Sequence, residues 1–300
     1  MLTPDQMLEG IYNRFGRHAG YRALHAKGTL TKGTFTAAPA AAELTKAAHM
    51  QGDPVPVTTR ISNGAGDPGS PDYAPDVRGL ATTFHLPDGS RTDISAQTAP
   101  RSPTRTPEEF LALLNASKPE PASLLRFPAF LATHPRVLLD LPANASALRP
   151  PESYATTAYY ALHAFKWIAA DGTERFVRYR WLPEAGESRL SPRAAKALGR
   201  DYLREEIAER LANGPVRFEL ELQIAGDGDD PDDSTRQWPP ERERVIAGAL
   251  ELSELAGTDA EDEVLVFDPT RLSDGIEPSG DPILLFRPKA YSISVERRSG

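Results

Sequence analysis

The feature that most constrains the fold is a pair of strand-like runs that meet at Asp171-Gly172. The stretch YYALHAFKWIAADGTERFVRYRWL (159–182) is rich in aromatic and β-branched residues on both sides of that dipeptide. Asp-Gly between two such runs is typical of a tight turn, because glycine readily accepts the positive φ that a short hairpin loop requires. The sequence therefore predicts an antiparallel hairpin in the middle of the chain.

Further segments alternate or show helical signals, and they occur in blocks. Strands are expected at 55–62, 78–86, 90–96, 218–225 and 249–255, and helices within 106–141 and at 191–214. Strands and helices do not alternate one by one, so a parallel sheet is not favoured. The pattern predicts an α+β fold in a single domain of residues 1–300, with a large antiparallel sheet, open or closed into a barrel, and helices outside it.

Charge and composition exclude several classes of function. The net charge of −8 makes nucleic acid or an anionic membrane a poor partner. The chain has no cysteine, which removes disulfides, thiolate nucleophiles and cysteine-ligated metal centres. The first residues lack the pattern of a signal peptide, and no apolar run is long enough to cross a bilayer. The cytoplasm is the expected location.

Two glycine-rich stretches have the look of ligand motifs but favour plain loops. Residues 64–69 read GAGDPG, which has the spacing of a dinucleotide-binding turn, yet Pro68 follows where a helix should begin. Residues 226–233 read GDGDDPDD, yet they lack the ligand spacing of a calcium-binding loop. We expect both to be surface loops. None of the six histidines forms an H-x-x-x-H pair, and no G-x-S-x-G motif is present.

Positive charge is concentrated around one tyrosine in RPKAYSISVERR (287–298). Arg287 precedes Tyr291 by four residues, and Arg297 and Arg298 follow it. If Pro288 is the first residue of a helix, Arg287 precedes that helix, Tyr291 lies one turn in, and Arg298 lies on the same face as Tyr291. A nearby guanidinium favours the phenolate form of tyrosine, and a metal ion favours it more strongly. The motif alone is also compatible with a packing tyrosine beside solvated arginines.

Six segments, in order along the chain, resemble those of haem catalases. The arginine followed by two residues and His-Ala-Lys-Gly that marks the distal segment is present at 22–28. The other segments are VTTRISNG (57–64), DVRGLATTFHLPDG (76–89), RFPAF (126–130), LHAFKW (162–167) and FDPTRLSDGIEPSGDPILLFRPKAY (267–291). The chain resembles the short catalase-related peroxidases in particular. This implies a closed antiparallel β-barrel with flanking helices, without the carboxyl-terminal helical domain of longer catalases.

The resemblance implies roles on the proximal side of a haem. Tyr291 matches the ligand of the iron, and Arg287 matches the arginine that keeps this ligand as a phenolate. His163 and Asp281 match the residues that anchor that arginine, so that an Asp–His–Arg–Tyr chain is expected. Other matches are to residues that contact the haem elsewhere. The arginines that bind its propionates correspond to Arg22, Arg60 and Arg298, the apolar residue of the proximal side to Phe267, and those of the distal side to Phe127 and Phe130.

On the distal side, His25 matches the acid–base histidine, and Ser62 matches the hydroxyl that fixes its tautomer. Catalases place an asparagine nearby to position hydrogen peroxide. An ungapped alignment of DISAQTAP (93–100) puts Gln97 and Thr98 there instead, and Thr98 is the residue expected to take the catalytic position. Thr98 is shorter and cannot donate an amide hydrogen bond, so weak catalase activity is expected.

These matches imply a haem b peroxidase that reduces organic hydroperoxides and hydrogen peroxide with an external electron donor. The chain is much shorter than typical catalases, so an NADPH site and an interlocked tetramer are not expected, and a homodimer stays open. The expected partners are a peroxide and a small-molecule donor, with no nucleic acid or membrane. Three alternatives remain: a haem-dependent hydroperoxide isomerase or lyase resembling allene oxide synthases, a non-catalytic haem-binding barrel, and a lipocalin-like barrel without haem.

Overall fold

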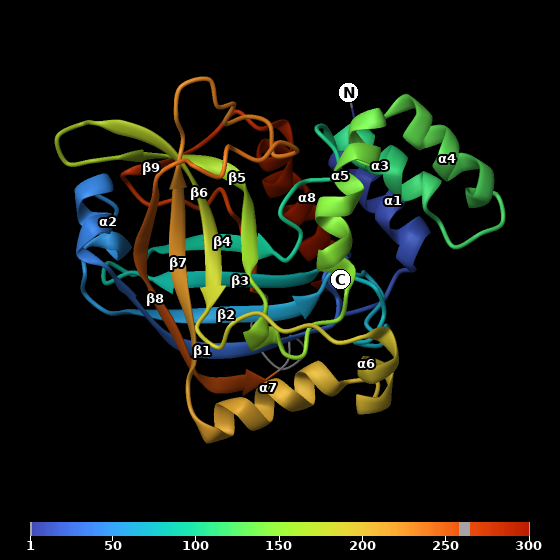
Figure 1. Cartoon of the computed structure of the whole chain (residues 1–300), viewed down its shortest axis with the longest axis horizontal. Coiled ribbons are helices and arrows are strands. Elements are labelled where there is room, and N and C mark those ends of the chain that lie inside the picture. The colour runs from blue at the N-terminus through green and yellow to red at the C-terminus, as the bar shows by residue number, and fades with distance from the viewer. Residues whose placement is uncertain (1, 258–264, 300) are drawn as a thin grey trace.

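Eight antiparallel strands close into a barrel, with helices on its outside (Figure 1). The computed structural model describes residues 2–257 and 265–299. The strands are hydrogen-bonded in the order β4-β3-β2-β1-β8-β7-β6-β5, and a pairing of β4 with β5 completes the circle. The strands are β1 (Gly28–Ala37), β2 (Val55–Asn63), β3 (Arg78–His85), β4 (Arg91–Gln97), β5 (Tyr159–Ile168), β6 (Glu174–Pro183), β7 (Val216–Ile224), β8 (Arg244–Gly257) and the short β9 (Ile276–Pro278) beside β5. The expected α+β fold with a closed antiparallel barrel is confirmed.

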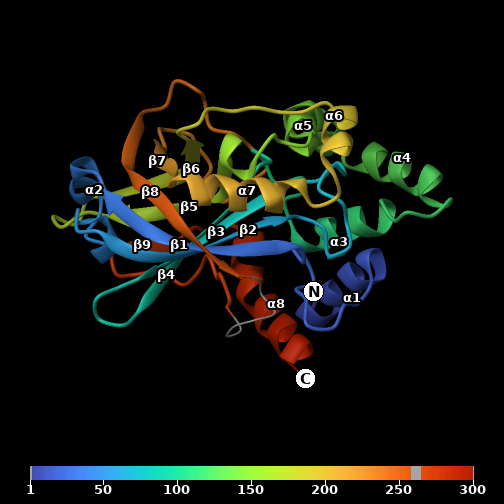
Figure 2. The same cartoon turned by 90° about the horizontal axis from the view of Figure 1, so that it is seen from below.

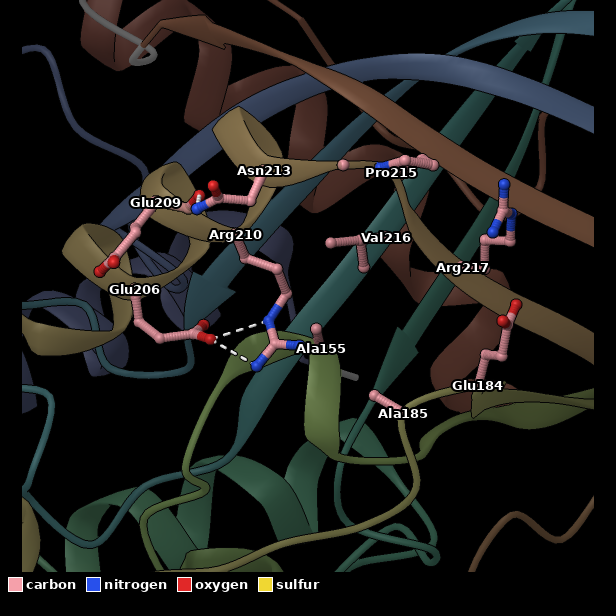
Figure 3. A pocket seen from close by; sticks show the side chains of 11 residues that line it. Ala155, Glu184, Ala185, Glu206, Glu209, Arg210, Asn213, Pro215, Val216 and Arg217 are labelled. Carbon is pink, nitrogen blue, oxygen red and sulfur yellow. Dashed lines mark hydrogen bonds and ion pairs between the residues drawn. The ribbon is translucent and has the colours of Figure 1, made fainter.

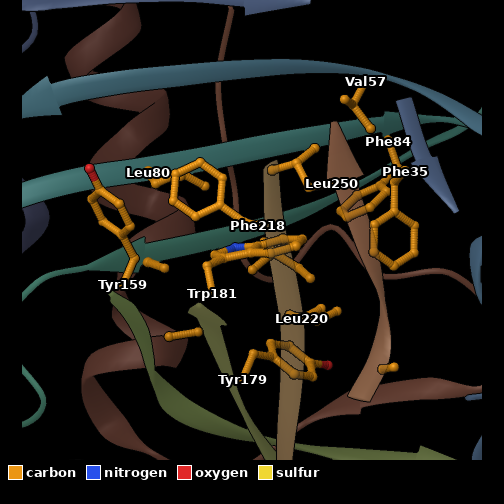
Figure 4. Packing of buried hydrophobic residues seen from close by; sticks show 14 of the residues in the cluster. Phe35, Val57, Leu80, Phe84, Tyr159, Tyr179, Trp181, Phe218, Leu220 and Leu250 are labelled. Atoms are coloured by element: carbon orange, nitrogen blue, oxygen red, sulfur yellow. The ribbon is translucent and has the colours of Figure 1, made fainter. Parts of the chain in front are cut away.

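The interior of the barrel is filled by side chains from every second residue of the strands (Figure 4). Phe35 on β1 lies edge-on to Phe84 on β3, with ring centroids 5.2 Å apart, and to Trp181 on β6 at 6.1 Å. Because successive side chains of a strand point to opposite faces, the residues between these positions point away from the core. The barrel therefore has a mainly apolar interior and an outer face on which other elements can build a site.

Helices lie on several sides of this barrel. Figure 2 shows α8 below the strands β1 and β4, with α1 to its right, and Figure 1 shows α7 beneath β1 and α2 on the left. Met7, Leu8 and Ile11 of α1 pack in one cluster with Leu114 of α3 and, more loosely, with Phe286 of α8. The helices are α1 (Pro4–Phe15), α2 (Pro39–Leu44), α3 (Pro107–Ala116), α4 (Ser123–Thr133), α5 (Pro135–Ala145), α6 (Pro192–Leu198), α7 (Tyr202–Asn213) and α8 (Pro282–Ser299), with 3₁₀ turns η1 (Ala48–Met50), η2 (Ser146–Leu148) and η3 (Tyr154–Thr156).

Three local expectations need correction. The single helix expected at 191–214 is broken into α6 and α7, because Gly199 adopts a φ of +112° that a helix cannot contain. The last helix starts at Pro282 rather than Pro288, because the carboxylate of Asp281 accepts hydrogen bonds from the backbone N–H groups of Ile283 and Leu284. The acidic stretch 226–233 is a loop as expected, but it is not wholly solvated, since Asp233 is only 1% exposed.

No helix within residues 2–257 and 265–299 combines the length and the apolar character needed to span a membrane.

Candidate active site

One row of residues runs across the outer face of four neighbouring strands. The pairings Gly28–Ser62, Ser62–Gly79 and Gly79–Gln97 link β1, β2, β3 and β4 in turn. Residues directly opposite each other in an antiparallel ladder share a face. The adjacent row contains Ile61, which belongs to the barrel core, so the row with Ser62 faces outward. We call these four residues the outward row.

His25 lies against the outward row in a strained conformation. Its φ of 56° is the only positive value at a non-glycine position among the described residues. Its backbone N–H donates to the carbonyl of Gly64 at 2.9 Å, and its Nδ1 lies 3.0 Å from Ser62 Oγ. A Cβ on Gly79 would fall 2.7 Å from that Nδ1, so only glycine leaves room for the ring. Strain that is held in place by specific bonds is characteristic of functional sites.

Burial, helped by nearby positive charges, keeps the imidazole of His25 neutral. Burial lowers the pKa of His25 to about 3, and the positive charges of Arg60, Arg287 and Arg22 contribute further to the lowering. Because Coulomb effects weaken with distance, these contributions indicate that the three arginines lie in the same region as this histidine. The fold thus brings together residues that are far apart in the sequence, including Arg287 on α8, and a neutral imidazole can accept a proton.

The tyrosine side of the site is built within one turn of α8. Arg287 donates to the hydroxyl oxygen of Tyr291 from Nε at 2.8 Å and from Nη2 at 2.5 Å. A guanidinium has donors only, so the tyrosine oxygen acts as an acceptor in both bonds. The structure therefore places Arg287 in contact with the oxygen of Tyr291, as the spacing of four residues in a helix predicts.

One carboxylate connects α8 to the barrel. Asp281 accepts a hydrogen bond from His163 Nδ1 at 3.0 Å while its other oxygen accepts from the N–H of Ile283 at 2.8 Å. His163 lies where the β5–β6 ladder skips from Ala161 to Phe165, an irregularity that re-aims the side chain. Burial lowers the pKa of His163, the hydrogen bond with Asp281 opposes this, and the charge of Arg287 adds to the lowering. Two links of the expected chain, Asp281–His163 and Arg287–Tyr291, are hydrogen bonds, whereas Arg287 acts on His163 through its charge.

Three further predicted residues lie around the same region. Arg22 donates to the carbonyl of Leu265 at 2.6 Å, and its guanidinium carbon lies 5.6 Å from the ring centroid of Phe267. Arg60 is 3% exposed on β2, and a Cβ on Gly28 would fall 2.5 Å from its Nη2. Both arginines act on the pKa of His25, so the structure gathers Arg22, Arg60 and Phe267 near the histidine.

Thr98 does not join the outward row. It is buried, and its hydroxyl accepts from the backbone N–H of Arg78 at 3.0 Å and lies 3.4 Å from the carbonyl of Ala147. The preceding residue, Gln97, pairs with Gly79 and therefore shares the face of Ser62. The sequence alone favours Thr98 as the functional residue, whereas the structure points to its neighbour Gln97. The register of the strand decides between the two, and it is known only from the pairing of β4 with β3.

The structure does not bring the two distal phenylalanines to this site either. Phe127 and Phe130 lie on α4 in a separate cluster with residues of α3 and α5, and Phe130 stacks on His134 with ring centroids 4.1 Å apart. A helical hairpin that packs on itself keeps these rings away from the barrel. Arg298 lies in α8, but its side chain is outside the described residues.

A hollow of about 580 Å³ lies elsewhere, between α7 and the start of β7 (Figure 3). Its lining includes Arg210 and Arg217, which form ion pairs with Glu206 and Glu251. It contains none of the predicted site residues, and both arginines that line it are paired with carboxylates, so it offers no cationic centre for an anionic ligand. The candidate active site is therefore the region between the outward row and α8.

Fold and site together define a β-barrel protein with a candidate active site between the barrel and its last helix. The segment before β1 contributes His25, and α8 contributes Tyr291. The chain belongs to the catalase family, whose profile matches residues 2–300.

Similar proteins agree with this assignment. A catalase-related peroxidase of Mycolicibacterium paratuberculosis is 49% identical over 100% of this chain and 96% of its own length. A catalase-related peroxidase of Synechococcus elongatus is 34% identical over 99% and 89%. A catalase of Pseudomonas aeruginosa is 30% identical over 100% of this chain but 61% of its own length. The fold matches that of catalase A from Saccharomyces cerevisiae, with a TM-score of 0.84 and 24% identity, over 96% of this chain and 63% of that one.

Proposed function

We propose that the protein is a haem b peroxidase that reduces organic hydroperoxides and hydrogen peroxide with external electron donors and has weak catalase activity. As a member of the catalase family, it is a peroxide-acting oxidoreductase. The observation that carries the finer proposal is the neutral His25, held by Ser62 and surrounded by the arginines that also serve the tyrosine side. A barrel that only bound a cofactor would not need a strained, neutral base.

The residues present fit a haem. The oxygen of Tyr291 accepts two hydrogen bonds from Arg287, and it would hold the metal as the kind of oxygen donor that ferric iron accepts in proteins. Arg22 and Arg60 would bind the propionates, and Phe267 beside Arg22 would contact the ring. When bound, the haem supplies an iron centre that takes up the oxidising equivalents of the peroxide and passes them to the donor.

His25 would move the proton of the substrate. If Nδ1 donates to Ser62, Nε2 is left as the acceptor for the hydroperoxide proton. His25 then returns that proton to the departing oxygen, so that water or an alcohol leaves instead of an anion. The row position of Gln97 would let its side-chain amide bind the peroxide, a role that Thr98 cannot fill with its hydroxyl bonded to the backbone.

Substrate preference tests this function directly. We expect kcat/KM for cumene hydroperoxide with an electron donor to exceed that for disproportionation of hydrogen peroxide, because a glutamine places its amide one methylene further out than an asparagine would. The relatives with the higher identities quoted above are named peroxidases rather than catalases, which supports this order. Steady-state assays measure both rates, and Gln97→Asn should raise disproportionation relative to peroxidation. Disproportionation faster than peroxidation in the unchanged protein contradicts the proposal.

The pH dependence of peroxide cleavage follows from the charge state of His25. The ordinary pKa of 6.5 is lowered to about 3, so the imidazole is neutral and able to accept a proton throughout the range from about pH 5 to about pH 8. We therefore expect a flat profile across this range and a loss of rate only as the pH falls towards about 3. Stopped-flow mixing with hydroperoxide at each pH measures it. A fall in rate centred near 6.5 would show that His25 is an ordinary solvated histidine.

A further inference from the structure

Asp72 is a buried carboxylate that the proposed chemistry does not use. It is 0% exposed and lies in the loop between β2 and β3. One oxygen accepts from Lys27 Nζ at 2.6 Å and from Asn63 Nδ2 at 2.8 Å. The other accepts from the N–H of Leu203, in the first turn of α7, at 2.9 Å. A buried carboxylate that accepts from three donors on its two oxygens can fix the geometry of the groups that it contacts.

Two of the three donors, Lys27 and Asn63, belong to the segments that carry His25 and Ser62. Lys27 lies two residues after His25, and Asn63 directly follows Ser62. The two segments also join through the backbone, since the N–H of Asn63 donates to the carbonyl of Lys27 at 2.9 Å. Asp72 is thus the common acceptor that sets the spacing of both halves of the His25–Ser62 contact.

The other partners of this network fix Asp72 from the outside. Asn63 accepts from the hydroxyl of Tyr154 at 2.8 Å, and Arg78 donates to the backbone carbonyl of Asp72 at 2.7 Å. Lys27 also pairs with Asp201 at 2.6 Å. Asp72 is therefore held through its backbone by Arg78 on β3, through its carboxylate by the start of α7, and through Asn63 by Tyr154 of η3.

The conformation of His25 shows why such an anchor is needed. A φ of 56° is unfavourable for a residue with a side chain, so the surrounding structure must impose it. The backbone bonds of His25 to Gly64 and of Ala26 to Ala65 hold one side of this segment. The Lys27–Asp72 pair holds the other side, immediately beyond the strained residue.

We propose that Asp72 is a positioning residue, which acts through Lys27 and Asn63 to hold the imidazole of His25 against Ser62. This role rests on the proposed function, in which His25 moves the proton of the peroxide. Removing the charge should leave a folded barrel in which the histidine is present but displaced. Displacement of a reacting group by about 1 Å can lower a rate on the order of 10²-fold.

A double-mutant comparison tests this role in the haem-loaded protein. Asp72→Asn keeps the size of the side chain but replaces one acceptor by a donor, and we expect kcat/KM for cumene hydroperoxide to fall between about tenfold and about 10²-fold. In the His25→Ala background the same substitution should change the rate by less than about twofold, because the group that Asp72 positions is gone. Equal losses in the two backgrounds, or no loss in the first, overturn the proposal.

Amide hydrogen exchange gives a readout that does not depend on turnover. Asp72→Asn should accelerate exchange at His25 and Ala26, whose N–H groups are bonded to Gly64 and Ala65. Unchanged exchange in this segment overturns the role of Asp72. If His25→Ala itself leaves peroxide cleavage intact, the proposed function fails instead, while faster exchange in Asp72→Asn still shows that the aspartate positions the histidine.

Two further variants control for the loss of a buried carboxylate as such and for a failure of Asp72→Asn to fold. Glu221→Gln removes another largely buried carboxylate, one that binds Arg180 and Arg244 on the opposite half of the barrel, and it should change neither kcat/KM nor exchange near His25. Lys27→Gln removes only one bond to Asp72 and carries the test if Asp72→Asn does not fold. In Lys27→Gln, kcat/KM should fall less than in Asp72→Asn, and it should fall only where His25 is present. An equal fall of kcat/KM in the unchanged protein and in the His25→Ala background counts against the proposal.

Discussion

Replacing Tyr291 with phenylalanine should lower the affinity for ferric haem by more than about 10²-fold, since the loss of a supporting residue alone costs 10- to 100-fold at metal sites. Phenylalanine has no oxygen to donate to iron. It also leaves the two N–H groups of Arg287 that now point at the tyrosine oxygen without an acceptor in a partly buried site. Titration with hemin, followed by the visible absorption spectrum, measures the affinity and the ligand field together.

Tyr12→Phe is the matched control for this change. Tyr12 lies on α1, which packs beside α8, and its ring faces the guanidinium groups of Arg17 and Arg297. Removing its hydroxyl should leave both the titration and the spectrum unchanged. If Tyr291→Phe binds hemin as tightly as the unchanged protein and with the same spectrum, the iron is held by another atom and the proximal assignment is wrong.

Replacing His25 with alanine should lower the rate of peroxide cleavage by about two orders of magnitude or more, which is the usual contribution of a positioned acid–base group. Haem should remain bound, because the residues proposed to hold it are on other segments or, like Arg22, three residues away. The imidazole also fills the space above Gly79, so the variant leaves a small hollow on the outer face of the barrel. Stopped-flow spectroscopy on the haem-loaded protein separates cleavage from binding.

His49 offers a control for the loss of a buried histidine as such. It is 1% exposed, and burial also lowers its pKa to about 3, but it lies beside Phe84 and Ser273 rather than in the candidate site. His49→Gln should cost stability and leave the cleavage rate per haem unchanged. Similar rates for His25→Ala and the unchanged protein would remove the histidine from the mechanism.

Features determined by short stretches of sequence were predictable. The hairpin around Gly172 follows from local turn chemistry, and the structure confirms it with a φ of 85° at that glycine. The Arg287–Tyr291 contact is likewise local, since residues four apart meet on one face of a helix. In contrast, His25 and Ser62 are 37 residues apart, and only the resemblance to catalases paired them before the structure did.

The remaining features depend on register and on long-range packing, which a single sequence does not specify. Thr98 and Gln97 differ by one position, and a shift of one residue exchanges the two faces of a strand. The apolar pattern of RFPAF is compatible with the wall of a site or with a helix core, and packing against α3 and α5 decides for the helix. The start of α8 depends on Asp281, whose capping role competes with the helix-starting signal of Pro288.

The circle of strands is joined at its seam by the single pair Gln97–Tyr160, whereas every other neighbouring pair of strands in the circle is linked through a longer ladder. A joint with so few bonds opens more readily than the rest of a sheet. Gln97 therefore lies at the shortest ladder in the circle of strands. Opening of this joint would move the side-chain amide of Gln97, whereas the contact of His25 with Ser62 lies where β1 and β2 are joined by a longer ladder.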